Sequence, residues 1–521
     1  MTAAPATDTT ASSTAPEVRL PPPRRRTWML CLVAAAVVAA LAALLAPAPP
    51  RLSADEQGDP QLAAQLRSIA DGVPVQALAA VRGTGSQVTA AAAVGRADAR
   101  DGRERPMTTS TPQEIGSVTK SLTGLLLADA VARGEVAPTT TLGEVHPDAD
   151  LPAEVAAITL DQLATHTSGL PSLAGPRLAR GALLNVTHGN PYGGQTPDGV
   201  LEEAATTRLR QEPGEYRYSN LGASVLGHAL AQRAGTPYPD LLRERVLDPL
   251  GMTSTVAAPA APPAGAAHEV AANGAASTPW ISTGGAPAGT GVWSTAEDLG
   301  RLLAAVADGT APGLAATEPR ADAGQEALRT GWGWLTFERD GRTFLLFNGQ
   351  TGGGVSSVAL DTGSGEWAAV TAPSTASTQT VALGLLGVDM SQPVAERSWL
   401  TLPVLVTAYL VVVLPLLALS LALRRRIRRP SQRVDRLRVL SEVLTLVAVL
   451  VVARGMGAWQ VVPPAVWVLA VGVGALASGL LLARWGSMTW PVRRRGLRWT
   501  GFGAGAVIGT VVVGAVLTGT G

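Results

Sequence analysis

A serine and a lysine three residues apart form the first pair that could carry chemistry. The apolar residues after them recur at helical spacing, which predicts a buried helix from about Ser117 to Arg133, ended by Gly134. Ser117 then lies at the helix start, where free N–H groups and the dipole favour a developing anion. Lys120 is one turn later on the same face. A desolvated lysine has a lowered pKa and can accept the serine proton, so the pair predicts a nucleophile with its base.

The alternative is a serine that caps the helix and a lysine in solvent, because Ser-x-x-Lys is a weak motif by itself. The basic composition favours the catalytic interpretation. Of the 41 lysine and arginine residues in the chain, Lys120 is the only lysine. Arginine stays protonated, whereas a buried lysine can lose its proton. The one retained lysine therefore indicates a position that needs an amine able to titrate.

A second polar pair, Tyr218 and Asn220, follows a Pro-Gly turn and precedes a helical pattern of apolar residues. The two side chains are thus predicted on a loop ahead of a helix, where they can face a cleft. A phenol beside a cationic amine can become phenolate-like and act as a base. An amide can orient a substrate carbonyl or the lysine. The alternative is a core tyrosine and an asparagine that caps the helix.

A strand-rich stretch supplies the third element. Alternating residues in 330–339 and 342–348 flank Asp340-Gly341, a strong tight-turn signal, and further strands follow at 355–360 and 366–371. This pattern predicts an antiparallel meander. The run Asn348-Gly349-Gln350-Thr351-Gly352-Gly353-Gly354 interrupts it, and such a glycine-rich edge lets a substrate approach the backbone and offers an N–H to an oxyanion. A phosphate-binding loop is disfavoured because no helix and no Gly-Lys-Ser/Thr follow.

Composition excludes several classes of function. The net charge is +1, which gives no support to nucleic-acid binding. A single cysteine, Cys31, excludes an internal disulfide framework, a zinc site built on several thiolates and a CxxC redox pair. The five histidines are scattered without paired ligand spacing, so we expect no metal and no cofactor.

Hydropathy predicts a membrane protein. Arginine clusters at 24–26, 424–429 and 493–498 alternate with apolar runs, and such clusters stay in the cytoplasm. The predicted organisation is a disordered cytoplasmic tail (1–26), a transmembrane anchor (27–46), a Pro-containing linker (47–66), a globular domain (67–390) and a C-terminal membrane domain (391–521) with spans at 400–423, 437–453, 461–482 and 501–517. The globular domain and the C-terminus are expected outside the cytoplasm. The alternatives are a cleaved signal peptide at the N-terminus and a transporter, which the nearly uncharged spans disfavour.

The three elements together resemble the serine beta-lactamase-related hydrolases, a family with class C beta-lactamases, D-alanyl-D-alanine carboxypeptidases and related esterases. Ser117-x-x-Lys120, Tyr218-x-Asn220 and the run that begins at Asn348 occur in the order and spacing of that family. Three further strings are similar to it: His166-Thr167-Ser168-Gly169-Leu170-Pro171, Asp248-Pro249-Leu250-Gly251-Met252, and the stretch 291–299. The resemblance implies an α/β (α+β) fold with an antiparallel sheet flanked by helices, plus a helical lobe and a cleft between them. Both ends of the domain would return to the one sheet.

The same resemblance implies roles for the residues. Ser117 would attack the carbonyl, and Lys120 and Tyr218 would handle its proton. The substrate-binding residues would be Asn220, Asn348, Gly349 and Gln350, with the N–H groups of Ser117 and Gln350 forming an oxyanion hole. His166 would be structural, because no acid partner for a Ser-His-Asp triad is evident.

One position departs from the family pattern. Two residues before Gly349 the family usually has lysine or histidine, which helps bind a substrate carboxylate, and here the residue is Phe347. Phenylalanine can neither bind a carboxylate nor relay a proton, so the change favours an esterase-like activity. Arg339 or Arg342 is a candidate for the missing charge.

The sequence therefore predicts a membrane-anchored, extracytoplasmic serine hydrolase that forms an acyl-enzyme with an ester, an amide, a beta-lactam or a D-Ala peptide. Its expected partners are a small-molecule or peptidoglycan-like substrate and the lipid bilayer, with no nucleic acid. The alternative is a catalytically silent, penicillin-binding-like protein that binds cell-wall fragments.

Overall fold

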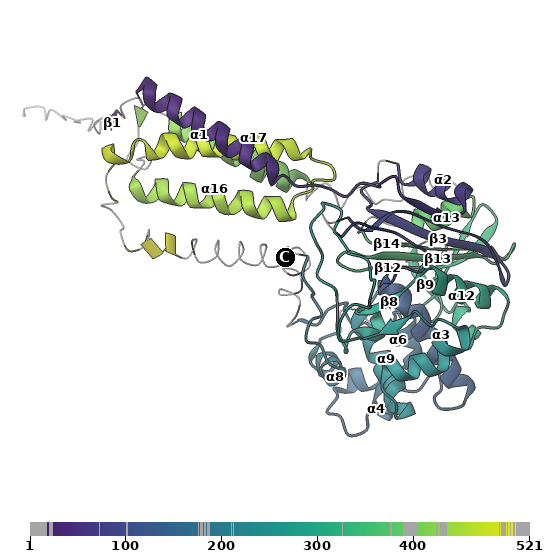
Figure 1. Cartoon of the computed structure of the whole chain (residues 1–521). Helices are drawn as coiled ribbons and strands as arrows, with labels where there is room; N and C mark the ends of the chain where they lie inside the picture. Colours follow the sequence, from purple (N-terminus) through teal and green to yellow (C-terminus); the bar gives the residue numbers. More distant parts are fainter. Residues whose placement is uncertain are drawn as a thin grey trace, which may run out of the picture. The chain divides into compact units, whose positions relative to one another are not determined.

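The computed structural model describes residues 24–388, 404–423 and 435–488, with gaps at 72, 100–102, 176, 178–180, 182–183, 185–187, 210, 212, 326 and 376–377, together with residues 18–19, 426–427, 490, 496, 499–500, 502–503 and 506 (Figure 1). The chain divides into two compact units. One comprises the described residues from 48 to 388, and the other comprises the described residues up to 47 and from 404 onward.

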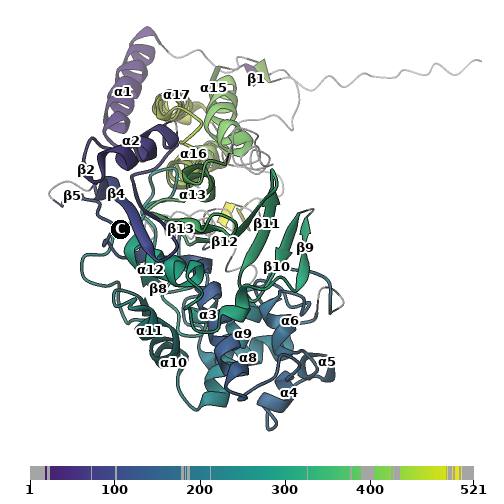
Figure 2. The same cartoon turned by 90° about the vertical axis from the view of Figure 1, so that its right-hand side faces the viewer.

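The larger unit is built on a ten-stranded sheet in the order β2-β4-β3-β14-β13-β12-β11-β10-β9, with β5 paired to β4, and the pairings are antiparallel (Figure 2). The strands are β2 (Glu56–Gly58), β3 (Ala77–Thr84), β4 (Gln87–Asp98), β5 (Arg105–Pro106), β9 (Ala321–Gln325), β10 (Leu328–Thr330), β11 (Leu335–Arg339), β12 (Arg342–Gln350), β13 (Val355–Asp361) and β14 (Glu366–Ala372). The β11–β12 turn has positive φ at Asp340 and Gly341, as a tight two-residue hairpin turn requires.

Helices cover both faces of this sheet. On one face, α2 (Pro60–Ile69) packs on β4, and α13 (Gln379–Leu385) packs on β13 and β14. Helix α12 (Ala296–Ala307) packs on β3, β13 and β14. Alternation along β13 shows that α12 covers the opposite face: Val355 and Ala359 enter the core with α2 and α13, whereas Val358 and Leu360 enter the core with α12. Both faces of the central strands are therefore buried.

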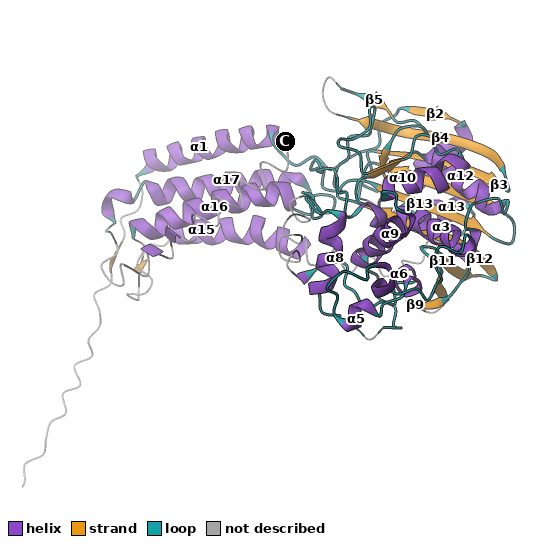
Figure 3. Cartoon of the chain, turned by 90° about the horizontal axis from the view of Figure 1, so that it is seen from below, coloured by secondary structure: helices purple, strands orange, loops and turns teal. Residues whose placement is uncertain are grey.

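A helical lobe adjoins the sheet (Figure 3). It contains α3 (Thr119–Ala132), α4 (Leu142–Val145), α5 (Ala153–Ala156), α6 (Leu160–Ala164), α8 (Pro197–Thr206), α9 (Asn220–Ala234), α10 (Tyr238–Leu242) and α11 (Asp248–Leu250). A small sheet in the order β6 (Gln113–Glu114), β8 (Val292–Ser294), β7 (Val256–Ala257) leads into α3 through the 3₁₀ turn Gly116–Val118. Apolar residues of the helical lobe and of β8 belong to the same hydrophobic core as those of α12.

The predicted antiparallel sheet with flanking helices and a helical lobe is confirmed, and both ends of the domain return to the sheet through α2 and α13, which contact each other. Two boundaries differ. The segment 47–66, predicted as a linker, holds β2 and most of α2, whose Leu62 and Leu66 are buried in the core. The stretch 330–339 is not one strand, since a turn at 331–334 separates β10 from β11.

Among the described residues, the second unit contains four helices long and apolar enough to cross a membrane: α1 (Arg25–Leu44), Val404–Leu423 with α15 (Leu414–Leu423) as its last part, α16 (Arg436–Met456) and α17 (Pro464–Leu482). Helix α17 packs against the other three. Large apolar side chains such as Leu30 and Leu469 stay exposed, as expected for a lipid-facing surface. A short β1 (Val18–Arg19) pairs with β15 (Arg426–Ile427). The span predicted at 501–517 and most of the 1–26 tail lie outside the described residues.

Candidate active site

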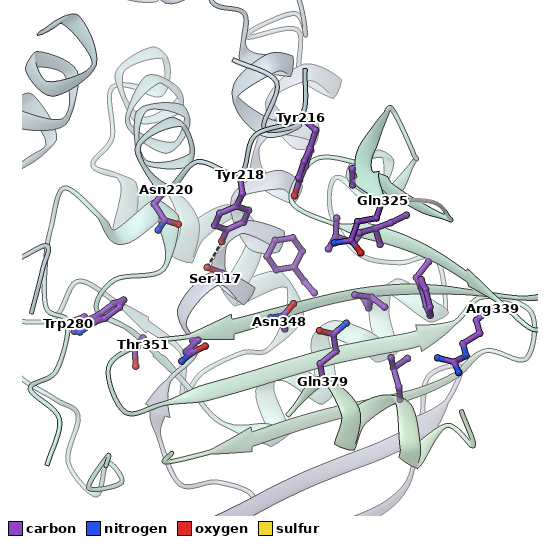
Figure 4. Close-up of a pocket in the computed structure, with 18 of the residues that line it drawn as sticks. Ser117, Tyr216, Tyr218, Asn220, Trp280, Gln325, Arg339, Asn348, Thr351 and Gln379 are labelled. Atoms are coloured by element: carbon purple, nitrogen blue, oxygen red, sulfur yellow. Dashed lines mark hydrogen bonds between the residues drawn. The ribbon is translucent and has the colours of Figure 1, made fainter. Parts of the chain in front are cut away.

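Ser117 lies on the 3₁₀ turn that begins the α3 segment, and its side chain is partly exposed in a pocket (Figure 4). The backbone N–H groups of a first helical turn have no acceptor within the helix, so the Ser117 N–H is placed to bind an external oxygen. The predicted helix over 117–133 is therefore observed almost as predicted, with Thr119–Ala132 in α-helix.

Lys120 is buried beneath Ser117, with 3% of its surface exposed, which excludes the solvated-lysine alternative. Its Nζ lies 2.9 Å from Ser117 Oγ, 2.8 Å from Asn220 Oδ1 and 2.6 Å from the Ala288 carbonyl oxygen. Burial lowers the pKa of Lys120 well below its ordinary value, which favours the neutral amine. A neutral amine has two hydrogens, and the two oxygens of Asn220 and Ala288 accept only. The nitrogen lone pair is then left for Ser117.

Tyr218 donates a hydrogen bond from its hydroxyl to Ser117 Oγ at 2.6 Å. Burial raises the pKa of this phenol, so it stays protonated and acts as a donor. The expectation of a phenolate-like base is therefore wrong for the unliganded site, because burial disfavours the anion and Lys120 in its neutral form offers no charge to offset it. The serine oxygen lies between a phenol that donates and an amine that can accept.

Asn220 is the first residue of α9, but it does not cap the helix. Ser219 is the cap, since its Oγ accepts from the Gly222 N–H at 2.8 Å. The amide of Asn220 is thus available for Lys120, and its Nδ2 donates to the Tyr192 hydroxyl at 2.7 Å. Tyr192 is a residue that the sequence reasoning missed. It lies 28 positions from Asn220 in a loop with no recognisable motif, and only the folded chain brings the two together.

Two glycines bring the β12 edge against the nucleophile. A Cβ on Gly116 would lie 2.6 Å from the Gln350 nitrogen, and a Cβ on Gly349 would lie 1.9 Å from the Ile115 carbonyl oxygen and 2.8 Å from the Ser117 nitrogen. Any side chain at either position would force these backbones apart. The predicted closeness of Gly349 and Gln350 to Ser117 is therefore observed, while the Asn348 side chain is exposed and lines the same pocket.

The later glycines of the run do not leave the room for a substrate that the sequence predicts; they leave room for other parts of the protein. A Cβ on Gly353 would lie 2.8 Å from Glu269 Cβ, and one on Gly354 would lie 2.6 Å from Glu269 Oε1. The space beside these glycines is thus filled by the protein itself. Thr351, at the start of the turn, donates from its hydroxyl to Glu269 Oε2 at 3.4 Å.

Glu269 and Glu114 form a buried pair beneath this turn. Glu269 Oε1 accepts from the Glu114 backbone N–H at 2.8 Å, and the Glu114 carboxylate accepts from the Trp280 N–H at 3.0 Å and the Gly291 N–H at 3.3 Å. Burial raises the pKa of Glu114 to about 7, and burial together with the charge of Glu114 raises the pKa of Glu269. The two carboxyl groups also hydrogen-bond each other, so the pair retains a proton at neutral pH.

This pair predicts that stability falls as the pH rises. In the folded chain the pair holds protons that the unfolded chain has released, so its contribution is complete below the unfolded pKa near 4.5 and is lost as the pH rises through the raised pKa values, about 7 for Glu114. The expected slope is up to about 1.4 kcal/mol per pH unit for each retained proton. Glu269→Gln keeps a donor for Glu114 but cannot titrate, so its melting temperature should fall less than that of the wild type between pH 6 and 9. Equal slopes in both proteins would contradict the assignment.

The pocket around Ser117 has a volume of about 720 Å³ and reaches from Trp280 and Asn220 on one side to Gln325 and Arg339 on the other (Figure 4). Phe347 lines it with only 4% of its surface exposed. Of the two candidate charges, Arg342 is bound to Asp361 at 2.7 Å and is not part of the pocket wall. Arg339 does line the pocket, on the side away from Asn220, and lies 3.7 Å from Asp340.

His166 is buried and contacts residues of the site without lining the pocket. Its Nδ1 accepts from the Ser219 N–H at 3.3 Å, and its ring lies against that of Tyr218, with 4.6 Å between the centroids. Burial lowers the pKa of His166 to about 3. This environment matches the structural part expected of it. Among the described residues, no group of three or more histidine, cysteine or acidic side chains could hold a metal ion.

The fold and this pocket belong to a known class. Residues 59–383 match the family described as Beta-lactamase, and the chain is therefore a member of the serine beta-lactamase and transpeptidase family. It is 33% identical over 210 residues to the D-alanyl-D-alanine-carboxypeptidase/endopeptidase AmpH of Escherichia coli, a match that covers 39% of this chain and 52% of AmpH. It is 34% identical over 172 residues to esterase EstB of Burkholderia gladioli, which covers 31% of this chain and 41% of EstB. The chain thus spans about half the length of these relatives or less.

Solved structures show the same fold. The octameric penicillin-binding protein homologue from Pyrococcus abyssi superimposes with a TM-score of 0.55 at 19% identity, over 64% of this chain and 78% of that one. The D-alanine carboxypeptidase AmpC from Burkholderia cenocepacia superimposes with a TM-score of 0.51 at 22% identity, over 63% of this chain and 97% of that one. The helices that could span a membrane lie outside the matched family region.

Proposed function

We propose that this chain is a membrane-anchored serine hydrolase that acts outside the cytoplasm through an acyl-enzyme on Ser117. The observation that carries the proposal is the placement of Ser117 Oγ in an open pocket, 2.9 Å from the Lys120 amine and 2.6 Å from the Tyr218 hydroxyl. A neutral amine, a phenol and a serine at these distances form the proton-transfer set that acyl transfer needs.

The reaction follows from these contacts. Ser117 Oγ attacks the substrate carbonyl carbon while its proton passes to the Lys120 nitrogen. The negative charge that develops on the carbonyl oxygen is stabilised by the backbone N–H groups of Ser117 and Gln350, whose backbone segments are in close contact. The C–O or C–N bond then breaks, and the leaving group takes its proton through Tyr218, which Lys120 resupplies. Water attacks the acyl-enzyme by the same relay in reverse, which releases the acid and restores Ser117.

Labelling with a fluorescent fluorophosphonate tests the proposal, because this probe reacts with an activated serine. Membranes that contain the full chain should be labelled and should hydrolyse p-nitrophenyl esters, and Ser117→Ala should lose both properties. Ser121→Ala is the matched control, since the Ser121 hydroxyl is buried and donates to the Gly333 carbonyl oxygen. If neither labelling nor ester hydrolysis depends on Ser117, the chain is instead the silent binder of cell-wall fragments, an alternative that Phe347 favours.

The carboxylate preference of the site is expected to depend on Phe347. An apolar ring lines the pocket where relatives usually have a cation, so substrates with a free carboxylate should be poor. Phe347→His should raise kcat/KM for a D-Ala peptide or a penicillin about tenfold relative to a neutral ester of similar size. Parallel rates for both substrate types before and after the substitution would discount the missing cation as the limiting factor.

The membrane topology is part of the proposal. The positive-inside rule predicts that the arginine clusters at 24–26, 424–429 and 493–498 lie in the cytoplasm and that the hydrolase unit lies outside. Alkaline phosphatase fused after residue 390 should be active, and the same reporter fused after residue 429 should be inactive. Activity of the second fusion would break the topology without affecting the proposed chemistry.

A further inference from the structure

The pocket extends beyond the residues that handle the proton into a region lined by apolar side chains. These residues are Ala323, Leu328, Leu335, Phe337, Leu346 and Leu383, contributed by β9, β10, β11, β12 and α13. We call this region the apolar arm. Gln325, Gln379 and Arg339 also line this region, and all three are at least partly exposed to solvent. Figure 4 places Gln325 and Arg339 on the side of the pocket opposite Asn220 and Trp280, with Ser117 between them.

The strand register makes the apolar arm a continuous surface. Leu328 is paired with Phe337, and Leu335 is paired with Leu346. Residues paired across neighbouring antiparallel strands share a face, and so do residues two apart on one strand, so these four side chains lie on one face of β10, β11 and β12. Leu346 and Leu383 are buried, whereas Leu328, Leu335 and Phe337 keep part of their surface in contact with solvent. An apolar ligand would remove that surface from water.

The apolar arm is connected to the reacting atoms through β12. Leu346 precedes Gln350 by four residues on this strand, which corresponds to roughly 13 Å of extended chain. Gln350 lies beside Ser117, and Leu346, Asn348 and Gln350 share one face of β12 and all line the pocket, whereas Phe347 faces the other side of the strand. A chain that starts at a carbonyl group bound to Ser117 can therefore follow β12 past Asn348 and enter the arm.

We propose that the apolar arm binds a linear aliphatic chain attached to the carbonyl group that Ser117 attacks. The preferred substrates are then esters or amides with an extended apolar substituent, such as fatty-acyl esters, rather than short carboxylate-bearing peptides. This inference rests on the proposed function, because it needs a carbonyl group at Ser117. It assigns the specificity of the site to residues far from the proton-transfer set.

A series of p-nitrophenyl esters tests the inference on the full chain in detergent. Each methylene moved from water into an apolar site raises kcat/KM about fourfold. From acetate through butyrate and hexanoate to octanoate, kcat/KM should therefore rise steeply. A matched series of acetate esters with lengthening alcohols is the control, since the proposal places the chain on the acyl side and only the acyl series should respond.

Two substitutions locate the effect. Leu335→Gln places a polar group in the arm and Leu328→Trp fills it, and both residues are partly exposed. Each should lower kcat/KM for the long-chain ester at least tenfold and change the value for acetate less than about threefold, because acetate has no chain to bury. Leu151→Gln, at a partly exposed leucine outside the pocket, is the matched control and should change neither value.

The outcomes separate the two proposals. Labelling of Ser117 together with a flat chain-length profile in the acyl series, or an equal loss for acetate and octanoate in the arm variants, overturns the inference and leaves the proposed function standing. Absence of Ser117-dependent labelling and of any ester hydrolysis overturns both. A steep profile in the acyl series that the arm variants abolish supports the inference.

Discussion

Lys120→Arg is expected to lower kcat/KM by about 10³-fold or more, the loss typical of removing a general base together with its positioning contacts. The wild-type amine is buried, its pKa is lowered, and its lone pair is directed to Ser117 when the two carbonyl oxygens hold its hydrogens. Arginine keeps a positive charge at all ordinary pH values and has no lone pair to offer. Rates of p-nitrophenyl ester hydrolysis and of fluorophosphonate labelling measure the effect.

The loss must be separated from a defect in folding, because a guanidinium group is larger than an ammonium group. Lys120→Met has similar length, lacks both charge and base, and should lose activity to the same extent while packing more easily in the buried site. Melting temperatures of the two variants within a few degrees of the wild type would assign the loss to chemistry. Activity retained in the folded Lys120→Arg protein would remove the lysine from the mechanism.

Tyr218→Phe is expected to lower kcat about 10²- to 10³-fold, with a larger loss for poor leaving groups. The substitution removes the hydroxyl that donates to Ser117 Oγ at 2.6 Å but keeps the ring that packs on His166. A p-nitrophenolate departs without a proton, whereas an alkoxide or an amine must be protonated. If Tyr218 is the route for that proton, the variant should lose at least tenfold more activity on an alkyl ester than on a p-nitrophenyl ester.

Tyr216→Phe is the matched control for this comparison. Tyr216 lines the same pocket and its ring also contacts His166, so the variant loses a hydroxyl without disturbing the proton path. Its rates on the two esters should keep the ratio of the wild type. If Tyr218→Phe lowers the rates on both esters equally, the Tyr218 hydroxyl positions Ser117 but does not deliver a proton to the leaving group.

Some contacts of the site can be predicted from local sequence spacing, and others cannot. The Ser117–Lys120 contact spans one helical turn, so their spacing alone predicts that the side chains meet. The bonds from Ser117 to Tyr218 and from Lys120 to Asn220 join residues 101 and 100 positions apart. Spacing carries no information at that range, and only the resemblance to a family predicted these contacts. Tyr192 and Glu269 belong to no motif, and both were found only in the folded chain.

The sequence by itself determined the side chains with reactive potential, the antiparallel meander, the apolar helices and the absence of a usual cation at Phe347, because these depend on residue type and short-range periodicity. The tertiary structure decided the protonation of Lys120 and Tyr218, the carboxyl pair under the turn and the apolar arm. Burial and long-range packing set these properties, and neither can be predicted from residue types and spacing within a short segment. A lysine becomes a base, and a set of leucines on separate strands becomes a binding surface, only when distant segments exclude water from them.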